Sequence, residues 1–325
     1  MHILDVINKT APYFEQHQIE SPRLTIELLL AHLLNKKRLD LYLEFERELE
    51  EPTLEKLRGM VKRRVAGEPL QYITGETEFC GLLFSVDKRV LIPRPETELL
   101  VEVVVERLKA GDGRQQAEMT APSTSESSTL NSVQDTRAGT QHSALQSSPT
   151  PGPESPITII DVGTGSGCIA VALVRKLPEA EVIAIDASPE ALEVAELNAR
   201  RHKVEKNIRF LEGDLLSKLP DSLKVDAVVS NPPYIANGEL AKLPKEVRDF
   251  EPVRALTAGE DGLEVIQRLV MDARCVLKPS GFVALEIGAG QRQAVEALFV
   301  KTGFSIEKIA KDLQGHERVI VAVPK

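Results

Sequence analysis

The sequence predicts an α/β protein with a doubly wound, mainly parallel sheet of seven strands and a small helical N-terminal domain. From Ile157 onward, short β-branched runs alternate with helical stretches, which is typical of successive strand–helix–strand units. Residues 3–65 instead carry apolar side chains three and four positions apart, the spacing of amphipathic helices. With 325 residues, 42% of them hydrophobic, the chain is long enough to bury a sizeable core.

The first part of the chain, residues 1–75, is expected to form the helical domain. Leu24 and Leu28 illustrate its apolar spacing. Ser21 followed by Pro22 is typical of a helix N-cap and a first helical turn.

The pattern changes after residue 75. Residues 76–95 hold two short apolar runs joined at Gly81, which predicts a β-hairpin that links two domains. A second domain is expected over residues 96–325, beginning with a helix whose dense apolar face lies against a sheet.

Residues 111–156 are rich in Ser, Thr, Gln and Pro and contain no aromatic residue. We expect a disordered insertion there, because such a segment cannot bury enough apolar surface to offset its chain entropy.

The second domain is expected to supply all seven strands. They are Ile157–Val162, Glu181–Asp186, Ile208–Leu211, Val225–Ser230, Phe282–Ile287, Phe304–Ile309 and Val319–Val323. The expected helices between them are Ile169–Lys176, Pro189–His202, Leu263–Leu277 and Gln291–Lys301. Ligands of doubly wound sheets bind beyond the carboxyl ends of the strands, so the residues that follow each strand are the most informative.

A glycine-rich loop follows the first of these strands. It consists of Gly163, Thr164, Gly165, Ser166 and Gly167. Glycines let the backbone approach a ligand closely, and the helix expected directly afterwards offers free N–H donors. A dinucleotide fingerprint would place its third glycine one position later, where Cys168 stands. The loop therefore favours another nucleoside-type cofactor over NAD.

Carboxylates follow the next two strands. Asp186 ends the second strand, where a carboxylate can accept hydrogen bonds from both hydroxyls of a ribose. Asp214, next to Leu215, follows the third strand, where it could accept a hydrogen bond from an adenine amino group. An Asp at a strand end is often only a helix cap. The glycine loop and both carboxylates at one edge of the sheet together favour an adenosine cofactor.

The segment after the fourth strand points to the reaction. It consists of Asn231, Pro232, Pro233 and Tyr234. Consecutive prolines fix their φ angles and carry no N–H group, so this turn offers acceptors and few donors. The Asn231 oxygen and the Pro232 carbonyl can therefore accept both hydrogens of a planar NH₂ group and aim its nitrogen at a sulfonium methyl. Tyr234 would pack on the flat face of that group, which makes this segment the candidate catalytic and substrate-binding site.

Other interpretations stay open on the residues alone. The segment could be a polyproline turn in which Asn231 caps locally. The same acceptor site would serve an adenine-specific DNA or RNA methyltransferase, although a net charge of −9 and a pI near 5.4 argue against a broad phosphate-binding surface. A further alternative is a non-catalytic cofactor-binding protein, although such a protein would not need an amide pocket.

Composition excludes several classes of protein. The three cysteines are far apart and the six histidines are scattered, so neither a disulfide framework nor a metal site is expected. The N-terminus lacks the pattern of a signal peptide, and no apolar run approaches the length of a membrane span. We expect a cytoplasmic monomer that binds neither membranes nor, directly, nucleic acid.

Taken together, the motifs resemble the release-factor glutamine methyltransferases, the PrmC or HemK proteins, over nearly the whole chain except the insertion. The segments that carry the resemblance are Tyr72–Gly75, Leu91–Glu98, the glycine loop, Asp186, Asn231–Tyr234 and Phe250–Pro252 with Ala255 and Leu256. The resemblance implies a Rossmann-like fold that binds S-adenosylmethionine. It also implies methylation of the glutamine side-chain amide in the Gly-Gly-Gln loop of peptide chain release factors, in support of translation termination.

The resemblance implies roles for individual residues as well. The glycine loop, Asp186 and Asn231 would bind the cofactor, and Asn231–Tyr234 would bind the glutamine. The loop that holds Arg94 and Pro95 would lie beside cofactor and substrate, and the helical domain would help to grip the release factor. Leu215 is a departure, because some relatives carry a tryptophan there against the adenine; the polar insertion is another.

The acids of the same loop region have two interpretations. Glu96 and Glu98 could hold the ammonium group of the cofactor, or they could be first-turn acids favoured by the helix dipole.

Overall fold

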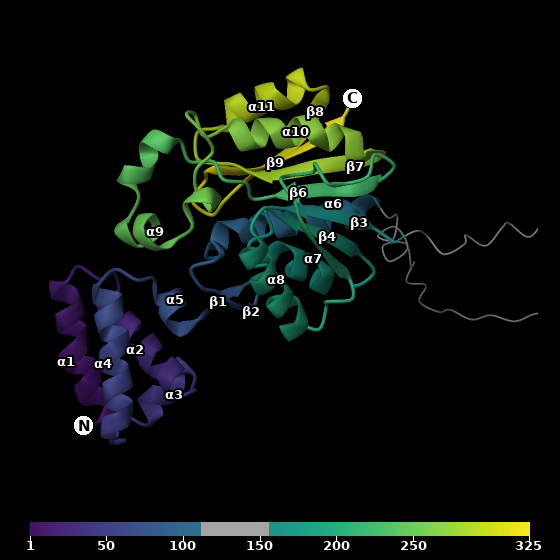
Figure 1. The fold of residues 1–325 in the computed structure, drawn as a ribbon. Helices are drawn as coiled ribbons and strands as arrows, with labels where there is room; N and C mark the ends of the chain where they lie inside the picture. Colours follow the sequence, from purple (N-terminus) through teal and green to yellow (C-terminus); the bar gives the residue numbers. More distant parts are fainter. Residues whose placement is uncertain (112–155) are drawn as a thin grey trace, which may run out of the picture.

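The computed structural model describes residues 1–111 and 156–325 (Figure 1). It contains a seven-stranded sheet with helices on both faces, preceded by a helical N-terminal part and a hairpin, so the expected fold class is confirmed. The insertion expected at residues 111–156 lies outside the described residues, except for its two end positions.

The N-terminal part is built from five helices. They are α1 (Ile3–Gln16), α2 (Pro22–Leu33), α3 (Arg38–Leu43), α4 (Glu51–Val65) and α5 (Leu70–Thr74). Side chains from α1, α2, α3 and α4 form a core of their own, which includes fully buried Phe14 and Leu30.

Ser21 stands at the N-cap position of α2 and Pro22 in its first turn, as expected, but Ser21 does not cap the helix with its side chain. Ser21 has φ 46° and ψ 60°, in the left-handed region, and its side chain makes no capping hydrogen bond. An N-cap side chain reaches the free N–H groups from extended backbone, which Ser21 does not adopt.

The hairpin consists of β1 (Glu76–Phe79) and β2 (Leu82–Ser85), paired antiparallel. Phe79 and Phe84 are fully buried in the core beneath the large sheet. Asn198 fixes the end of the hairpin: its side-chain oxygen accepts from the Ser85 N–H at 2.7 Å, and its amide nitrogen donates to the carbonyls of Ser85, at 3.0 Å, and Ser166, at 2.9 Å. The hairpin is therefore packed against the large sheet and tied to the glycine loop through Asn198.

The large sheet has the strand order β5-β4-β3-β6-β7-β9-β8. Its strands are β3 (Thr158–Val162), β4 (Glu181–Asp186), β5 (Ile208–Glu212), β6 (Val225–Ser230), β7 (Leu277–Glu286), β8 (Phe304–Lys311) and β9 (Glu317–Pro324). Only β9 runs against its neighbours. β7 begins five residues before the expected Phe282, because Leu277 already pairs with Val225 ahead of a register shift.

Two helical layers cover the sheet (Figure 1). α6 (Glu98–Gly111), α7 (Cys168–Lys176) and α8 (Pro189–Arg201) share a core with one face, and α10 (Glu264–Val276) and α11 (Arg292–Lys301) share a core with the other. Neighbouring residues of β3 alternate between these cores, as Ile159 and Ile160 do, which is the period of a strand buried on both faces.

A long connection between β6 and α10 reaches toward the N-terminal helices. It contains η3 (Asn237–Lys242), α9 (Lys245–Phe250) and η4 (Val253–Ala255), and Figure 1 shows α9 above the end of α4. Arg64 of α4 is paired with Glu246 of α9 at 2.8 Å, which joins the two parts of the chain.

The chain returns to the middle of the sheet at β6. It runs outward from β3 through β4 to β5 and then places β6 on the free side of β3, where Val162 pairs with Ser230. The loops that follow β3 and β6 therefore begin side by side, at the switch point where doubly wound sheets bind their ligands.

None of the helices within residues 1–111 and 156–325 is long and apolar enough to cross a membrane.

Candidate active site

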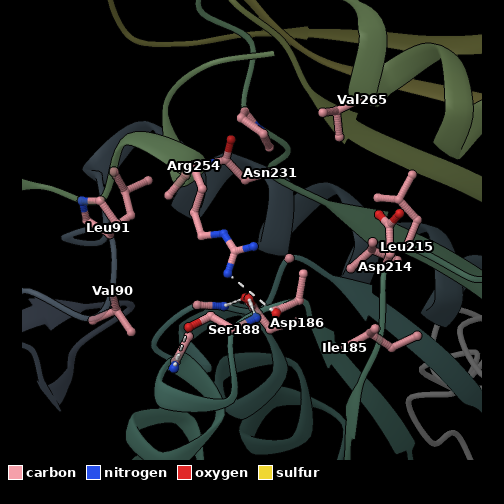
Figure 2. A pocket seen from close by; sticks show the side chains of 18 of the residues that line it. Val90, Leu91, Ile185, Asp186, Ser188, Asp214, Leu215, Asn231, Arg254 and Val265 are labelled. Atoms are coloured by element: carbon pink, nitrogen blue, oxygen red, sulfur yellow. Dashed lines mark hydrogen bonds between the residues drawn. The ribbon is translucent and has the colours of Figure 1, made fainter. Parts of the chain in front are cut away.

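A cavity of about 300 Å³ lies at the carboxyl ends of β3, β4, β5 and β6 (Figure 2). Seven of the candidate cofactor- and substrate-binding residues line it: Gly163, Gly165, Asp186, Asp214, Leu215, Asn231 and Pro233. Its other walls come from the segment after the hairpin, with Val90 and Leu91, and from Arg254 and Val265. The structure thus brings together residues from five separate loops.

Two glycines of the loop after β3 serve different purposes. Gly163 has φ +73°, and a Cβ added there would meet nothing within 4 Å, so the missing side chain leaves the cavity open. At Gly167 a Cβ would lie 3.0 Å from the Cβ of Ala195. That contact is tighter than ordinary packing, so Gly167 permits the close approach of α7 and α8.

The remaining loop residues lie behind the cavity wall. Thr164 is buried and donates its hydroxyl to Asp161 at 2.6 Å, and the Asp161 carboxylate also accepts from the Ala170 N–H at 3.2 Å. Burial raises the pKa of Asp161 to about 7. Ser166 is buried as well, with its carbonyl bound to Asn198. Thr164, Ser166 and Gly167 therefore shape the loop without lining the cavity.

Asp186 presents a fixed carboxylate to the cavity. One oxygen accepts from the Gly165 N–H and the other from the Ser188 N–H, both at 2.9 Å. A carboxylate has about four lone-pair positions, so each oxygen keeps capacity for one more donor. Two further hydroxyl groups can be bound there without any rearrangement.

The far end of the cavity is partly apolar. Figure 2 shows Ile185, Leu215 and Val265 around this end. Asp214 lies beside them but is exposed, with a 2.5 Å ion pair to Arg268. This end of the cavity therefore offers apolar contact surface with a carboxylate beside it.

A second cavity, of about 260 Å³, adjoins the first. It is lined by Arg94, Pro232, Tyr234, Ile235, Leu243, Val247 and Leu256, together with Leu91, Asn231, Pro233 and Ala255, which line both cavities. Pro95 is exposed and lines neither. Asn231 therefore stands in the wall shared by the two cavities.

The amide of Asn231 has a defined partner. Its Nδ2 donates to the hydroxyl oxygen of Thr97 at 3.0 Å, and Thr97 is only 2% exposed. The Oδ1 of Asn231 is thereby turned away from Thr97. The Asn231 oxygen is the atom that the sequence analysis expects to accept a hydrogen bond from a substrate NH₂ group. The part played by the Thr97 hydroxyl was not predicted.

The backbone of the Asn-Pro-Pro-Tyr turn is held by Gln291, which the sequence analysis missed. The Gln291 side chain donates to the Tyr234 carbonyl at 2.9 Å and accepts from the Gly288 N–H at 3.0 Å. A Cβ on Gly262 would lie 2.3 Å from the same carbonyl oxygen, so only glycine fits there. The turn is thus clamped from two sides.

Arg94 and the acids near it also have structural partners. Arg94 donates to the buried carboxylate of Glu251 at 2.6 Å, and Glu251 accepts from the Ile92 N–H at 3.3 Å. Burial raises the pKa of Glu251, and Arg94 opposes that rise. Glu98 lies in the first turn of α6, as in the second of its two interpretations, and its carboxylate accepts from the Cys80 N–H at 2.7 Å, which fixes the hairpin.

Within residues 1–111 and 156–325, no group of three or more His, Cys, Asp and Glu side chains has an arrangement suited to a metal ion.

Comparison with known proteins identifies relatives along almost the whole chain. Residues 5–75 match the family described as PrmC N-terminal domain, and residues 149–245 match the methyltransferase small domain. The chain is 37% identical over 318 residues to a release factor glutamine methyltransferase of Geobacter sulfurreducens, across 98% of this chain and 95% of that protein. Proteins of the same name match from Chlorobaculum tepidum, at 39% identity over 97% of this chain and 95% of the relative, and from Nitratidesulfovibrio vulgaris, at 36% over 95% and 90%.

Proposed function

The chain belongs to the family of release factor glutamine methyltransferases, and on this basis we propose that it methylates the side-chain amide nitrogen of the glutamine in the Gly-Gly-Gln loop of release factors. The observation that carries the proposal is the position of Asn231, whose amide stands between two adjoining cavities with its oxygen turned away from Thr97. One cavity suits a nucleoside cofactor and the other a side chain that ends in NH₂.

S-adenosylmethionine is the methyl donor, and when bound it supplies an electrophilic methyl group on a sulfonium sulfur. The first cavity fits it. The Asp186 carboxylate has free capacity for the two ribose hydroxyls, and Gly163 leaves open the space that a side chain would fill. Leu215 and Asp214 would hold the adenine, by apolar contact and by accepting from its amino group.

The residues of the second cavity supply positioning. An amide nitrogen is a weak nucleophile, because its lone pair is delocalised. The Asn231 oxygen and the Pro232 carbonyl would accept its two hydrogens, and these hydrogen bonds strengthen as the nitrogen becomes pyramidal, which favours the transition state. Tyr234 would pack against the planar amide. Its phenol has a raised pKa because of burial, so it stays protonated and does not act as a base at neutral pH.

The remaining parts of the chain would serve the protein substrate. We assign residues 1–75 to recognition of the release factor, the hairpin segment 76–95 to a linker and residues 96–325 to the methyltransferase domain. The pairing of Arg64 with Glu246 supports this assignment, because it joins the helical part to the connection that carries the second cavity. Arg94 would contact the substrate from the cavity wall, whereas the contact of Pro95 rests on the family resemblance alone.

We further propose that the protein is a monomer, that it works in the cytoplasm and that it does not bind nucleic acid directly. Its acidic net charge of −9 supports the last point.

Methyl transfer with labelled S-adenosylmethionine tests the function. The acceptors are a release factor, the same factor with its loop glutamine replaced by alanine, and duplex DNA. We expect label on the unmodified factor alone. Label on DNA would instead support an adenine methyltransferase, and equal label on the glutamine-to-alanine factor would place the methyl group elsewhere. Asn231→Ala should remove the label, while Asn237→Ala, at an exposed position of the same connection, should retain it.

A further inference from the structure

We propose that Thr97 and Glu286 act as a pair of positioning residues, which fix the direction in which the Asn231 amide faces. The inference rests on the proposed function, since it concerns how the acceptor site for the substrate NH₂ group is held. Neither residue lines the cavities; both act through Asn231.

The direction of this amide decides whether the site can bind its substrate group. The two ends of an asparagine amide have nearly the same size, but one is an acceptor and the other a double donor. If the amide were reversed, its NH₂ would face the NH₂ of the substrate, and no hydrogen bond would form. The protein must therefore distinguish the two orientations by a partner on the far side.

Thr97 is that partner, but a hydroxyl group cannot select an orientation by itself. It can accept from the Nδ2 of Asn231, as it does at 3.0 Å, or donate to the Oδ1 of a reversed amide. The selection requires a third group that takes up the hydroxyl proton. With that proton engaged, the Thr97 oxygen is left only as an acceptor, and the amide has one favourable orientation.

Glu286 is placed to take up this proton. It ends β7 at the same edge of the sheet, where its neighbour Leu285 pairs with Ser230, the residue before Asn231. Interaction with the Thr97 side chain opposes the rise that burial gives to the pKa of this carboxyl. An ionised carboxyl only accepts, so the chain of donors runs in one direction, from Asn231 to Thr97 to Glu286.

The burial of Glu286 supports a specific role. Its side chain is 1% exposed, and Oε2 has no hydrogen-bond partner within the described parts of the chain. A buried carboxyl with an unpaired oxygen destabilises a fold, and its neighbours Leu285 and Ile287 are fully buried apolar residues. An apolar residue would thus suit the core at position 286, whereas the site needs an acceptor there.

Three variants test the pair at pH 8, where the Glu286 carboxyl is ionised, with a release factor as substrate. Thr97→Val keeps the shape of the side chain and removes the hydroxyl, and we expect kcat to fall about 10- to 100-fold, as misplacement of a positioning group does. Thr97→Ser keeps the hydroxyl and should restore kcat. Glu286→Gln can both donate and accept, so kcat should fall while the affinity for S-adenosylmethionine stays within about threefold.

The Thr97→Val substitution made in an Asn231→Asp protein separates an effect on the orientation of residue 231 from an effect on packing. An aspartate offers oxygen on both sides, so in the Asn231→Asp protein there is no orientation to select, and Thr97→Val should reduce kcat much less than in the parent. Non-additivity of this kind marks residues that act through one another. An equal loss of kcat in both backgrounds, or a loss in Thr97→Ser as large as in Thr97→Val, would overturn the proposal.

A readout without substrate keeps this inference separate from the proposed function. The side-chain amide signal of Asn231 in a ¹⁵N NMR spectrum can be identified by its disappearance in Asn231→Asp. We expect it to shift in Thr97→Val and in Glu286→Gln but not in Thr97→Ser. A parent protein that labels no release factor would refute the function alone, whereas an Asn231 signal that is unchanged in Thr97→Val would refute the positioning pair.

Discussion

Replacing Asp186 by asparagine should weaken the binding of S-adenosylmethionine far more than the loss of one charge at the protein surface would. The substitution changes few atoms, but both oxygens of this carboxylate are already held by backbone N–H groups, those of Gly165 and Ser188. An asparagine keeps one oxygen and turns an NH₂ group toward the other N–H. It therefore loses one acceptor for the ribose and sets two donors against each other.

The magnitude follows from these contacts. A hydrogen bond to a charged group contributes about 1.5 to 3 kcal/mol, and leaving a polar group unsatisfied costs about 1 kcal/mol or more. We expect a loss of about 2 to 4 kcal/mol in binding, or about 30- to 1000-fold in Kd. Asp214→Asn is the matched control at the same cavity. Asp214 is exposed and paired with Arg268, so its loss should raise Kd less than about tenfold.

Calorimetric titration of the three proteins with S-adenosylmethionine measures both effects, and thermal unfolding without cofactor shows whether the loop itself is damaged. If Asp186→Asn binds within about threefold of the parent at an unchanged Tm, the carboxylate does not hold the ribose. The same conclusion follows if Asp214→Asn weakens binding more than Asp186→Asn does.

Three further predictions concern the residues around the methyl-acceptor site. Asn231→Ala should lower kcat by about 100- to 1000-fold, the loss typical of a removed transition-state hydrogen bond, with cofactor Kd changed only a few-fold; equal single-turnover rates in variant and parent would contradict it. Gln291→Ala frees the Tyr234 carbonyl and should lower kcat about tenfold with little change in Tm, and a large drop in Tm would reveal a structural role instead. Burial raises the pKa of Glu286 from 4.5 to about 7, so the folded protein holds this proton more tightly than the unfolded chain and stability falls as pH rises from about 4.5 to about 7. Denaturant titrations at several pH values measure the free energy of unfolding. In Glu286→Gln its decrease between pH 4.5 and 7 should be smaller by on the order of 3 kcal/mol, and the same pH dependence as in the parent would contradict the burial argument.

The sequence predicted the fold well because its signals are local. Alternating β-branched runs and helical faces repeat within ten or twenty residues, and the glycine loop, Asp186 and Asn231 follow strands whose ends the topology brings together. The position of a cap is predicted more easily than its geometry. Ser21 stands at the N-cap position of α2, yet its backbone is left-handed and its side chain makes no capping hydrogen bond.

The supports of the site could not be predicted, because their partners are distant in the sequence. Thr97 and Asn231 are separated by 134 positions, and Gln291 and Tyr234 by 57. No spacing or periodicity relates such pairs. A threonine in a first turn and a glutamine before a helix look like ordinary capping or surface residues until the strand order places them beside the acceptor turn.

Asn198 has a consequence for which substitutions this chain can accept. Its amide offers one acceptor and two donors, and all of them are bound to backbone groups of Ser85 and Ser166. Aspartate lacks the donors, leucine lacks every polar atom, and glutamine is one methylene too long for a position that is fully buried. A helix residue that contacts neither cofactor nor substrate is therefore as restricted in its identity as the residues of the active site.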